Sequence, residues 1–459
     1  MLLHPGQPIF FVLSDIKIPH TANIGVRCGF SAHSGRCYDI SIKRYIRYFG
    51  GFVFFHFVFL PNIIFTFFDN ACNLSENIKI NYSVFNIFCI LNHTDYKIQN
   101  QKMSWIKCIE KITEEKYDLY FKHFNPDLFD AREWAKKAKA AGMKYITITT
   151  KHHDGFCLYD SKDLNEGYDT VHSACGRDLI RELVDACNEE GILPIFYHAT
   201  LDWKQKSFEN DFPKYLQYLN DSVELLCTQY GKIGGFWFDG NWSRRDADWK
   251  EDELYSMIRR LQPEAMIINN TGLNARGAAG HPELDSVTFE QGHPTPMDRE
   301  GMPKYLAAEM CHTMNQHWGF GGADYNYKSL ADLIETLCSC RKVGANYLLN
   351  IGPTGDGEVP FMQEALLRGI GGWIQATKGA IYEAKPCGIL GDGKNFALRA
   401  GNKLYFFIHN LSIVGNSDVT FGECTEGLRT FRGVADKVKR VCWLDNGKEI
   451  GFRQTGDEF

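Results

Sequence analysis

The chain has 459 residues, which is long for one small domain and suits a barrel of strands and helices with an appended module. Hydrophobic residues make up 44% and charged residues 23%, the proportions of a globular protein that buries a large core. The formal net charge is -6. We therefore expect neither a nucleic-acid partner nor an anionic membrane partner, because such binding needs clustered positive charge.

The chain's fifteen cysteines follow no disulfide or zinc-site spacing. Cys338 and Cys340, for example, are separated by one residue rather than the two of a redox or zinc motif. We expect most cysteines to be buried thiols, which favours a reducing compartment. Secretion stays open because N-glycosylation sequons begin at Asn73, Asn92, Asn241, Asn269 and Asn410. Residues 1–13 lack the basic region and cleavage site of a signal peptide.

The first 102 residues differ in character from the rest. They are rich in Phe, Ile and Asn and have neither a helical nor a strand period, so we expect an irregular extension. Residues 45–68 are apolar enough to be considered as a membrane span, but His56, Pro61 and Asn62 interrupt them. The prediction is against a span.

From residue 103 onward, predicted helices and strands alternate. The first helix begins after the N-cap Asp130 and ends at Gly142, and a β-rich strand follows over residues 145–150. Further helices are expected over 178–190, 212–230, 251–261 and 329–342, and further strands over 192–199, 233–239, 265–270 and 346–353. This alternation implies parallel strands joined by right-handed crossovers.

The predicted fold is therefore α/β, a (β/α)8-like TIM barrel over residues 103–384. Beyond it, short strand-like runs separated by Gly and Asn predict a small β-rich domain over residues 385–459.

In such a barrel the site is built at the carboxyl ends of the strands, so polar residues that follow an apolar run are candidates. Four runs end in this way, at His152 and His153, at Tyr197 and His198, at Asp239, and near Glu290. Asp239 follows an entirely apolar stretch that includes Trp237, and a carboxylate there must point into a cleft or bear a desolvation cost. The alternative is a helix N-cap. Glu290 is a weaker candidate when its position alone is considered, and Glu283 is a nearby competing candidate.

The pair His152 and His153, beside Asp154, could be metal ligands. Adjacent residues on a strand point to opposite faces, however, and no H-E-x-x-H pattern supplies a third ligand. We interpret the histidines as hydrogen-bonding groups for substrate, with one of the two open to being an ordinary core histidine.

Five motifs that follow one another along the chain are specific enough to compare with a known family. They are FKHFNPDLFDAREWAKKAKAAGMKYITITTKHHDGFCLYDS, GFWFDG, DSVTFEQ, HWGFG and LLNIGPTGDGEVP. With these motifs, residues 105–382 resemble glycoside hydrolase family 29, the α-L-fucosidases, and the KHHDGF run is the most distinctive.

The resemblance implies an enzyme that hydrolyses fucosylated glycans or fucosides by retaining double displacement, without a metal or other cofactor. It places the nucleophile at Asp239 and the general acid/base at Glu290. It also implies that fucose is bound by His152, His153, Tyr197, Trp237, Trp105 and Trp318.

Three departures from the family pattern open alternatives. Ser104 stands where the family has a glutamate, and Thr271 where it has an arginine, with Arg276 as a candidate substitute. The family's first strand is absent directly before Trp105, and its nearest counterpart is residues 51–57, with His56. The alternatives are an inactive fucose-binding protein and a metal-dependent hydrolase that uses His152 and His153.

Overall fold

The computed structural model describes residues 48–49, 52–53, 107, 111–298, 300–302, 304–409 and 428–459. The chain divides into two compact units, Met1–Ser75 and Glu76–Phe459. The expected domain boundaries at 103 and 385 stay predictions.

In the first unit, β1 (Tyr48–Phe49) and β2 (Phe52–Val53) form a short antiparallel pair. Of residues 51–57, the structure describes Phe52 and Val53, which pair with Phe49 and Tyr48. The rest of that segment, His56 included, lies outside the described residues, as does most of the considered span over 45–68. Among the residues that are described, no helix is long and apolar enough to cross a membrane.

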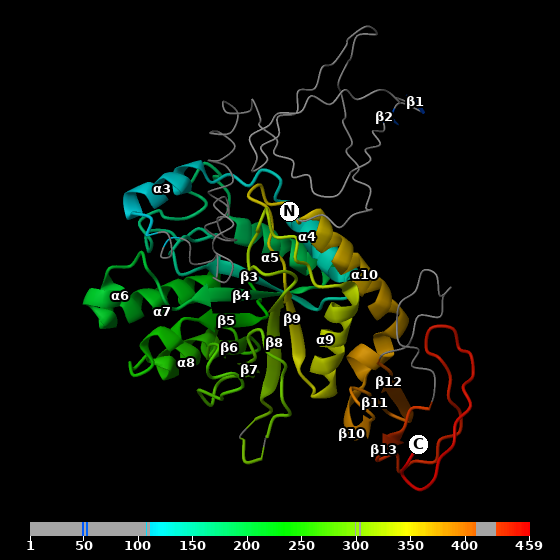
Figure 1. Ribbon diagram of the computed structural model, residues 1–459. Coiled ribbons are helices and arrows are strands. Elements are labelled where there is room, and N and C mark those ends of the chain that lie inside the picture. The colour runs from blue at the N-terminus through cyan, green and yellow to red at the C-terminus, as the bar shows by residue number, and fades with distance from the viewer. Residues whose placement is uncertain are drawn as a thin grey trace, which may run out of the picture. The chain divides into compact units, whose positions relative to one another are not determined.

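The second unit is built on a curled parallel sheet of seven strands in the order β3-β4-β5-β6-β7-β8-β9 (Figure 1). The strands are β3 (Tyr145–Lys151), β4 (Leu193–Ala199), β5 (Gly235–Asp239), β6 (Met266–Asn270), β7 (Ser286–Thr288), β8 (Ala307–Thr313) and β9 (Asn346–Asn350). Each pairs with its neighbour in sequence, in parallel. The predicted barrel-like α/β fold is confirmed.

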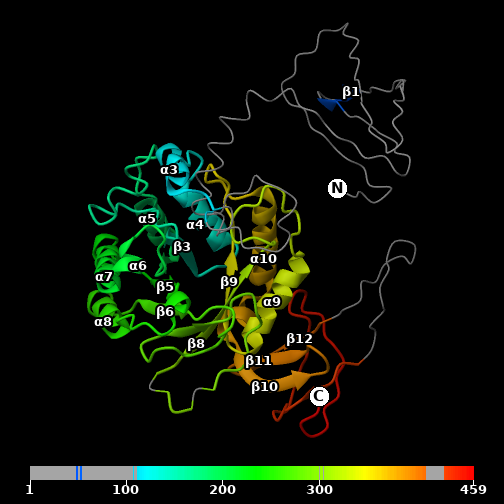
Figure 2. The ribbon, with the colours of Figure 1, turned by 60° about the vertical axis from the view of Figure 1, so that its left-hand side comes forward.

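Helices lie outside the curled sheet, as the two views in Figures 1 and 2 show. They are α3 (Glu114–His123), α4 (Ala131–Ala140), α5 (Leu179–Glu190), α6 (Ser207–Asn210), α7 (Phe212–Gln229), α8 (Glu251–Leu261), α9 (Leu330–Lys342) and α10 (Phe361–Lys378), with a 3-10 turn η2 (Asn241–Arg244) and a π-turn η3 (Gly379–Glu383). The sequence prediction missed α3, α6, α10 and β8.

Local signals determine where the predicted helices begin. Asp130 accepts a hydrogen bond from the Glu133 N–H at 3.0 Å, and Asp178 accepts one from Arg181 at 2.8 Å. Gly191 ends α5 in the left-handed conformation with a φ of 70°, which glycine adopts without steric cost. These caps explain why the boundaries of α4 and α5 could be predicted closely.

Strand β5 shows how the core positions the site. Phe236 and Phe238 face the helices and belong to the main hydrophobic cluster, whereas Trp237 faces the inside of the sheet with Tyr197. Because side chains alternate along a strand, Asp239 falls on the same inner face as Trp237, at the carboxyl end.

The small sheet contains β10 (Lys385–Gly391), β11 (Phe396–Ala400), β12 (Lys403–Phe407) and β13 (Phe431–Arg432) in the antiparallel order β12-β11-β10-β13. Phe396 and Leu398 pack against α9 and α10 through Cys338, Ile334 and Trp373. The predicted C-terminal β domain is therefore confirmed.

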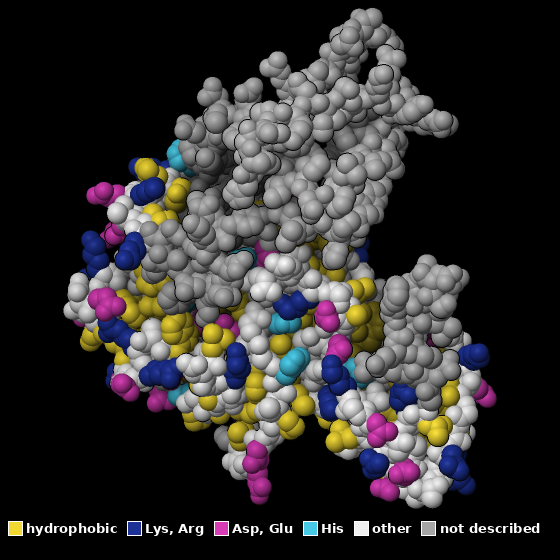
Figure 3. Space-filling model, viewed as in Figure 1, with side chains coloured by type: hydrophobic (Ala, Val, Ile, Leu, Met, Phe, Trp, Pro, Cys, Tyr) yellow, Lys and Arg dark blue, Asp and Glu magenta, His cyan; other side chains and the backbone are white. Residues whose placement is uncertain are grey.

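The described cysteines are free, and most are buried, as predicted. On the face shown in Figure 3, positive and negative side chains of the described residues are interspersed.

Helix α10 follows β9, the last strand of the parallel sheet, and packs beside α4, which precedes β3. Leu367, Ile370 and Ile374 of α10 meet Ala141 just after α4 in one apolar cluster. The helices lie close together at Gly371, where an added Cβ would lie 2.2 Å from the Ala140 carbonyl oxygen. The described sheet begins at β3 and ends at β9, and the outer helix layer is continuous across these two strands.

We predict that Gly371→Ala lowers the free energy of unfolding by about 1–3 kcal/mol, because the new methyl group meets rigid backbone. The matched control is Gly372→Ala in the same helix, where an added Cβ meets nothing within 4 Å. That exchange should stabilise by about 0.5–1 kcal/mol, since alanine is the better helix former. Urea unfolding of both variants checks this, and equal effects would contradict the packing argument.

Candidate functional site

A cavity of about 700 Å³ opens at the carboxyl ends of the parallel strands. Its polar and aromatic lining includes His152, His153, Tyr197, Trp237, Asp239, Trp242, Asn270, Glu290, Cys311 and Trp318. All the predicted site residues in the described part of the chain are therefore brought together. Trp105 and Ser104 lie outside the described residues. The cavity continues between β3 and β9 as far as α4 and α10, where most of its lining is apolar.

The Asp239 carboxylate accepts hydrogen bonds from three different elements. Tyr197 Oη on β4 donates to Oδ2 at 2.7 Å, Trp242 Nε1 in η2 donates to Oδ1 at 2.7 Å, and Asn270 Nδ2 on β6 donates to Oδ1 at 3.1 Å. The side chain is 14% exposed, so it faces the cavity. Burial and the neighbouring Asp239 charge raise the pKa of Tyr197 well above its ordinary value, which keeps Tyr197 a donor.

Glu290 lies just after β7 and shares a hydrogen-bond donor with Asp239. Asn270 Nδ2 is 3.0 Å from Glu290 Oε2 and 3.1 Å from Asp239 Oδ1. These two oxygens can thus be no farther apart than both bonds laid end to end, roughly 6 Å. The competitor Glu283 accepts from Arg259 Nε at 3.1 Å before β7 begins, and it is absent from the cavity lining.

His152 and His153 follow the last residue of β3 and both line the cavity. The strand rule that would send them to opposite faces fails because the strand has already ended at Lys151. The His152 ring stacks on Tyr197, with 5.6 Å between centroids. Burial and the adjacent His153 lower the pKa of His152 well below its ordinary value, so this imidazole is neutral at pH 7.

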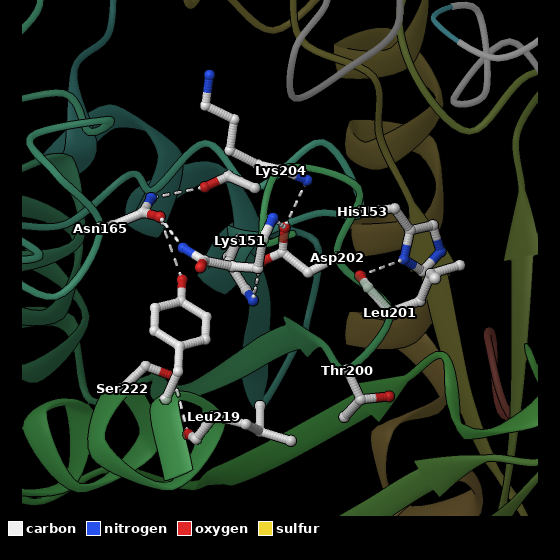
Figure 4. Close-up of polar contacts among 12 residues, drawn as sticks. Lys151, His153, Asn165, Thr200, Leu201, Asp202, Lys204, Leu219 and Ser222 are labelled. Carbon is white, nitrogen blue, oxygen red and sulfur yellow. Dashed lines mark hydrogen bonds and ion pairs between the residues drawn. The ribbon is translucent and has the colours of Figure 1, made fainter. Parts of the chain in front are cut away.

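His153 is 1% exposed, and its two ring nitrogens have different surroundings. Nδ1 lies 3.2 Å from the Leu201 carbonyl oxygen (Figure 4). Nε2 lies 3.7 Å from Asp239 Oδ2. Since a carbonyl oxygen only accepts, we assign the proton to Nδ1. In a neutral ring with this tautomer, Nε2 is an acceptor on the side of Asp239. The core histidine of this region is His198, whose nitrogens contact Thr150 and Ser222.

Trp237 forms part of the inner wall beside Asp239. Its ring stacks on Tyr197 at 5.4 Å, and its Nε1 donates at 2.9 Å to Glu309 on β8, a carboxylate that also accepts from Tyr145 Oη. Glu309 is 1% exposed, and burial raises its pKa.

Sequence reasoning missed Asn270, Trp242 and Glu309. Asn270 ends the apolar strand β6, so the rule that selected Asp239 also applies to it. Trp242 carries no such signal, because its position depends on the turn of η2. Glu309 lies in the middle of β8, and its charge is one reason why that strand was not predicted.

Two residues connected with the departures from the family pattern, Thr271 and Arg276, make hydrogen bonds near the site. Thr271 Oγ1 donates to the Ala275 carbonyl at 2.7 Å, so its hydroxyl serves the local turn. Arg276 Nε donates to the Glu290 backbone carbonyl at 2.5 Å, which brings this arginine beside the site without making it part of the cavity lining. Within the described ranges, no three His, Cys, Asp or Glu side chains are grouped so that they could hold a metal ion.

Asp154, which follows the two histidines, is a buried carboxylate whose Oδ2 accepts from Tyr117 Oη at 3.0 Å. Burial raises its pKa to about 7, against the lowering effect of the Tyr117 hydrogen bond. This contact ties α3 to the loop that carries His152 and His153.

We predict that Asp154 makes the protein lose stability as the pH rises from about 4 to 7. In that window the folded carboxyl holds a proton that the unfolded one has lost, so each pH unit costs up to about 1.4 kcal/mol. Asp154→Asn should remove this slope. Denaturant titrations at several pH values check it, with the exposed Asp246→Asn as the control. A stability difference from wild type that does not vary with pH would contradict it.

Comparisons with known proteins agree with this site. A family model described as alpha-L-fucosidase matches residues 82–379. The tissue alpha-L-fucosidase of Mus musculus is 29% identical over 289 residues, which cover 59% of this chain and 60% of that protein. The Bos taurus enzyme of the same name is 30% identical over 282 residues, covering 57% and 56%. The match therefore spans less than two thirds of these relatives' own length.

Among solved structures, alpha-L-fucosidase isoenzyme 1 from Paenibacillus thiaminolyticus aligns with a TM-score of 0.65 and 32% identity, covering 83% of this chain and 91% of its own. The family model matches more than half of the chain and includes every described residue around the Asp239 carboxylate, so this chain belongs to the α-L-fucosidase family.

Proposed function

We propose that this chain is a retaining α-L-fucosidase that releases a terminal fucosyl unit from a glycan or fucoside. The observation that carries the proposal is the pair of carboxylates, Asp239 and Glu290, joined through one amide nitrogen of Asn270 inside the cavity. The names of the family relatives point to the same activity, and the proposal extends it to this chain.

The separation of the carboxylates supports retention of configuration. Retaining glycosidases hold their two carboxyl groups about 5–5.5 Å apart, whereas inverting enzymes need about 6.5–9.5 Å to admit a water. The shared Asn270 donor keeps the facing oxygens within roughly 6 Å, which favours the shorter class.

In the proposed mechanism, Asp239 attacks the anomeric carbon while Glu290 protonates the departing glycosidic oxygen. A covalent fucosyl ester forms on Asp239. Glu290 then takes a proton from water, which attacks the same carbon, breaks the ester bond and frees fucose. The donors from Tyr197, Trp242 and Asn270 hold Asp239 in place and suit an ionised nucleophile.

The remaining residues are assigned to substrate recognition. The neutral His152 and the acceptor Nε2 of His153 suit sugar hydroxyl groups. Trp237, Trp318 and Trp105 would offer aromatic faces to the apolar side of the sugar ring. The proposed reaction needs no metal or other cofactor, and its partner is the fucosylated substrate.

We predict that Asp239→Ala lowers the turnover of an aryl α-L-fucoside by about a thousandfold or more, because the covalent path is lost. Added azide should then give a fucosyl azide of inverted configuration, since a single displacement remains. Glu290→Ala with azide should give the retained azide, because azide replaces water in attacking the Asp239 ester. The anomeric configuration, read by NMR, assigns the roles.

Glu283→Ala is the matched control and should behave as wild type. Wild-type protein that binds fucose but never hydrolyses the fucoside would favour the inactive binding protein instead. Hydrolysis that stops with a chelator and returns with zinc would favour the metal-dependent alternative.

We also predict that Trp242→Phe lowers kcat about 10- to 100-fold with little loss of folding stability. The exchange keeps an aromatic ring and removes the N–H donor to the Asp239 carboxylate, and a hydrogen bond to a charged group contributes about 1.5–3 kcal/mol. Trp134→Phe is the control, because its Nε1 donates at 3.1 Å to the Gly357 carbonyl, outside η2 and away from the carboxylates. Equal kcat losses in both variants would count against this role of Trp242.

A further inference from the structure

A fully enclosed ion pair lies behind the proposed site. Lys151 Nζ, at the end of β3, is 2.7 Å from Asp202 Oδ2 in the loop after β4, and both side chains are 0% exposed. The Lys151 ammonium also lies 5.1 Å from the centre of the Tyr218 ring. Removing two charges from water costs about as much as their attraction returns, so stability alone does not account for such a pair.

The second oxygen of Asp202 organises its own loop. Oδ1 accepts from the backbone N–H groups of Lys204 at 2.9 Å and Gln205 at 3.1 Å. Asp202 therefore fixes the turn with one oxygen and attaches that turn to β3 with the other (Figure 4). Gly155 allows the close approach, since an added Cβ there would lie 2.8 Å from Asp202 Oδ1.

The two neighbours of Asp202 in the chain both hold His153. The Leu201 carbonyl accepts from His153 Nδ1 at 3.2 Å, and the Trp203 N–H donates to the His153 carbonyl at 2.7 Å. The ring of Trp203 also lies 5.5 Å from that of His153, between centroids. One neighbour thus orients the imidazole and the other anchors its backbone.

We infer that Asp202, through its ion pair with Lys151, is a positioning residue that sets the tautomer and direction of His153 toward the Asp239 carboxylate. The inference rests on the proposed function for its catalytic consequence only. Its structural part does not depend on activity. The imidazole proton stays on Nδ1 because the turn fixed by Asp202 holds the Leu201 carbonyl in place.

The first test is independent of activity. In full-length protein labelled with ¹⁵N-histidine, the His153 signals are assigned by their loss in His153→Ala. We expect a single Nδ1–H tautomer in wild type and a mixture of tautomers in the double variant Lys151→Met/Asp202→Asn. This variant leaves no unpaired buried charge and keeps an oxygen for the turn, so it should fold. Unchanged His153 signals would overturn the inference, whether or not the chain hydrolyses fucosides.

The second test is a double-mutant cycle on aryl fucoside hydrolysis. We expect the double variant to lower kcat/KM by at least about tenfold in wild type and by less than about twofold in a His153→Ala background, because its effect passes through His153. Equal losses in both backgrounds would show an independent, merely structural role.

Asp285→Asn is the matched control for both tests. Asp285 pairs with Arg259 at 2.7 Å and Lys304 at 2.9 Å just before β7, at the opposite end of that strand from the site. It should lower the unfolding temperature and leave kcat/KM and the His153 signals unchanged. If the His153 signals also changed in this variant, a loss of stability anywhere in the fold would be enough to change them, and the inference would be overturned.

Discussion

The site depends on one constraint, the need to satisfy a carboxylate at the end of an apolar strand. Asp239 directly follows three aromatic residues of β5, and burial of its charge without partners would be costly. Two of its donors come from β4 and β6, which are separate in sequence and flank β5 in the sheet, and the third comes from η2, the turn that follows β5. The parallel order β4-β5-β6 is what makes this convergence possible, because all three strands end on the same side.

The hydrogen-bond donor that Asp239 and Glu290 share also affects the distance between them. Asn270 presents one amide nitrogen to both carboxylates, so the spacing of Asp239 and Glu290 follows from the register of β5 and β6. In that register Asp239 lies opposite Asn270. A slip of one residue would send the Asn270 side chain to the helix face and separate the two acids.

The sequence predicted the parts of the fold that local chemistry controls. The caps Asp130 and Asp178 and the apolar run into Asp239 are readable without tertiary information, and the structure confirms the elements they bound. It did not predict β8, whose central Glu309 is tolerated only because Trp237 and Tyr145 donate to it from other strands. Trp242 was missed for the same reason: its role arises from a turn whose direction no periodicity records. His152 and His153 were predicted as residues, but their shared orientation was not, because it depends on where β3 stops.

The cavity's extension between β3 and β9 links the site to the helix layer. Its apolar walls include Ile148 of β3, Leu348 of β9 and Ile370 of α10, and its polar end holds the carboxylates. Of the strands that the structure describes, only β4 pairs with β3, which also borders the cavity and is followed by both histidines. The end of β3 is also held by the turn that follows it, since Lys151 bridges to Cys157 and the Leu158 N–H donates to the Thr150 carbonyl at 2.8 Å. The Lys151–Asp202 ion pair and the Trp203 N–H bond to His153 connect it once more to the loop after β4. The buried ion pair and the hydrogen bonds to His153 thus act on one loop, so the same contacts that join this loop to the end of β3 also hold the imidazole beside Asp239.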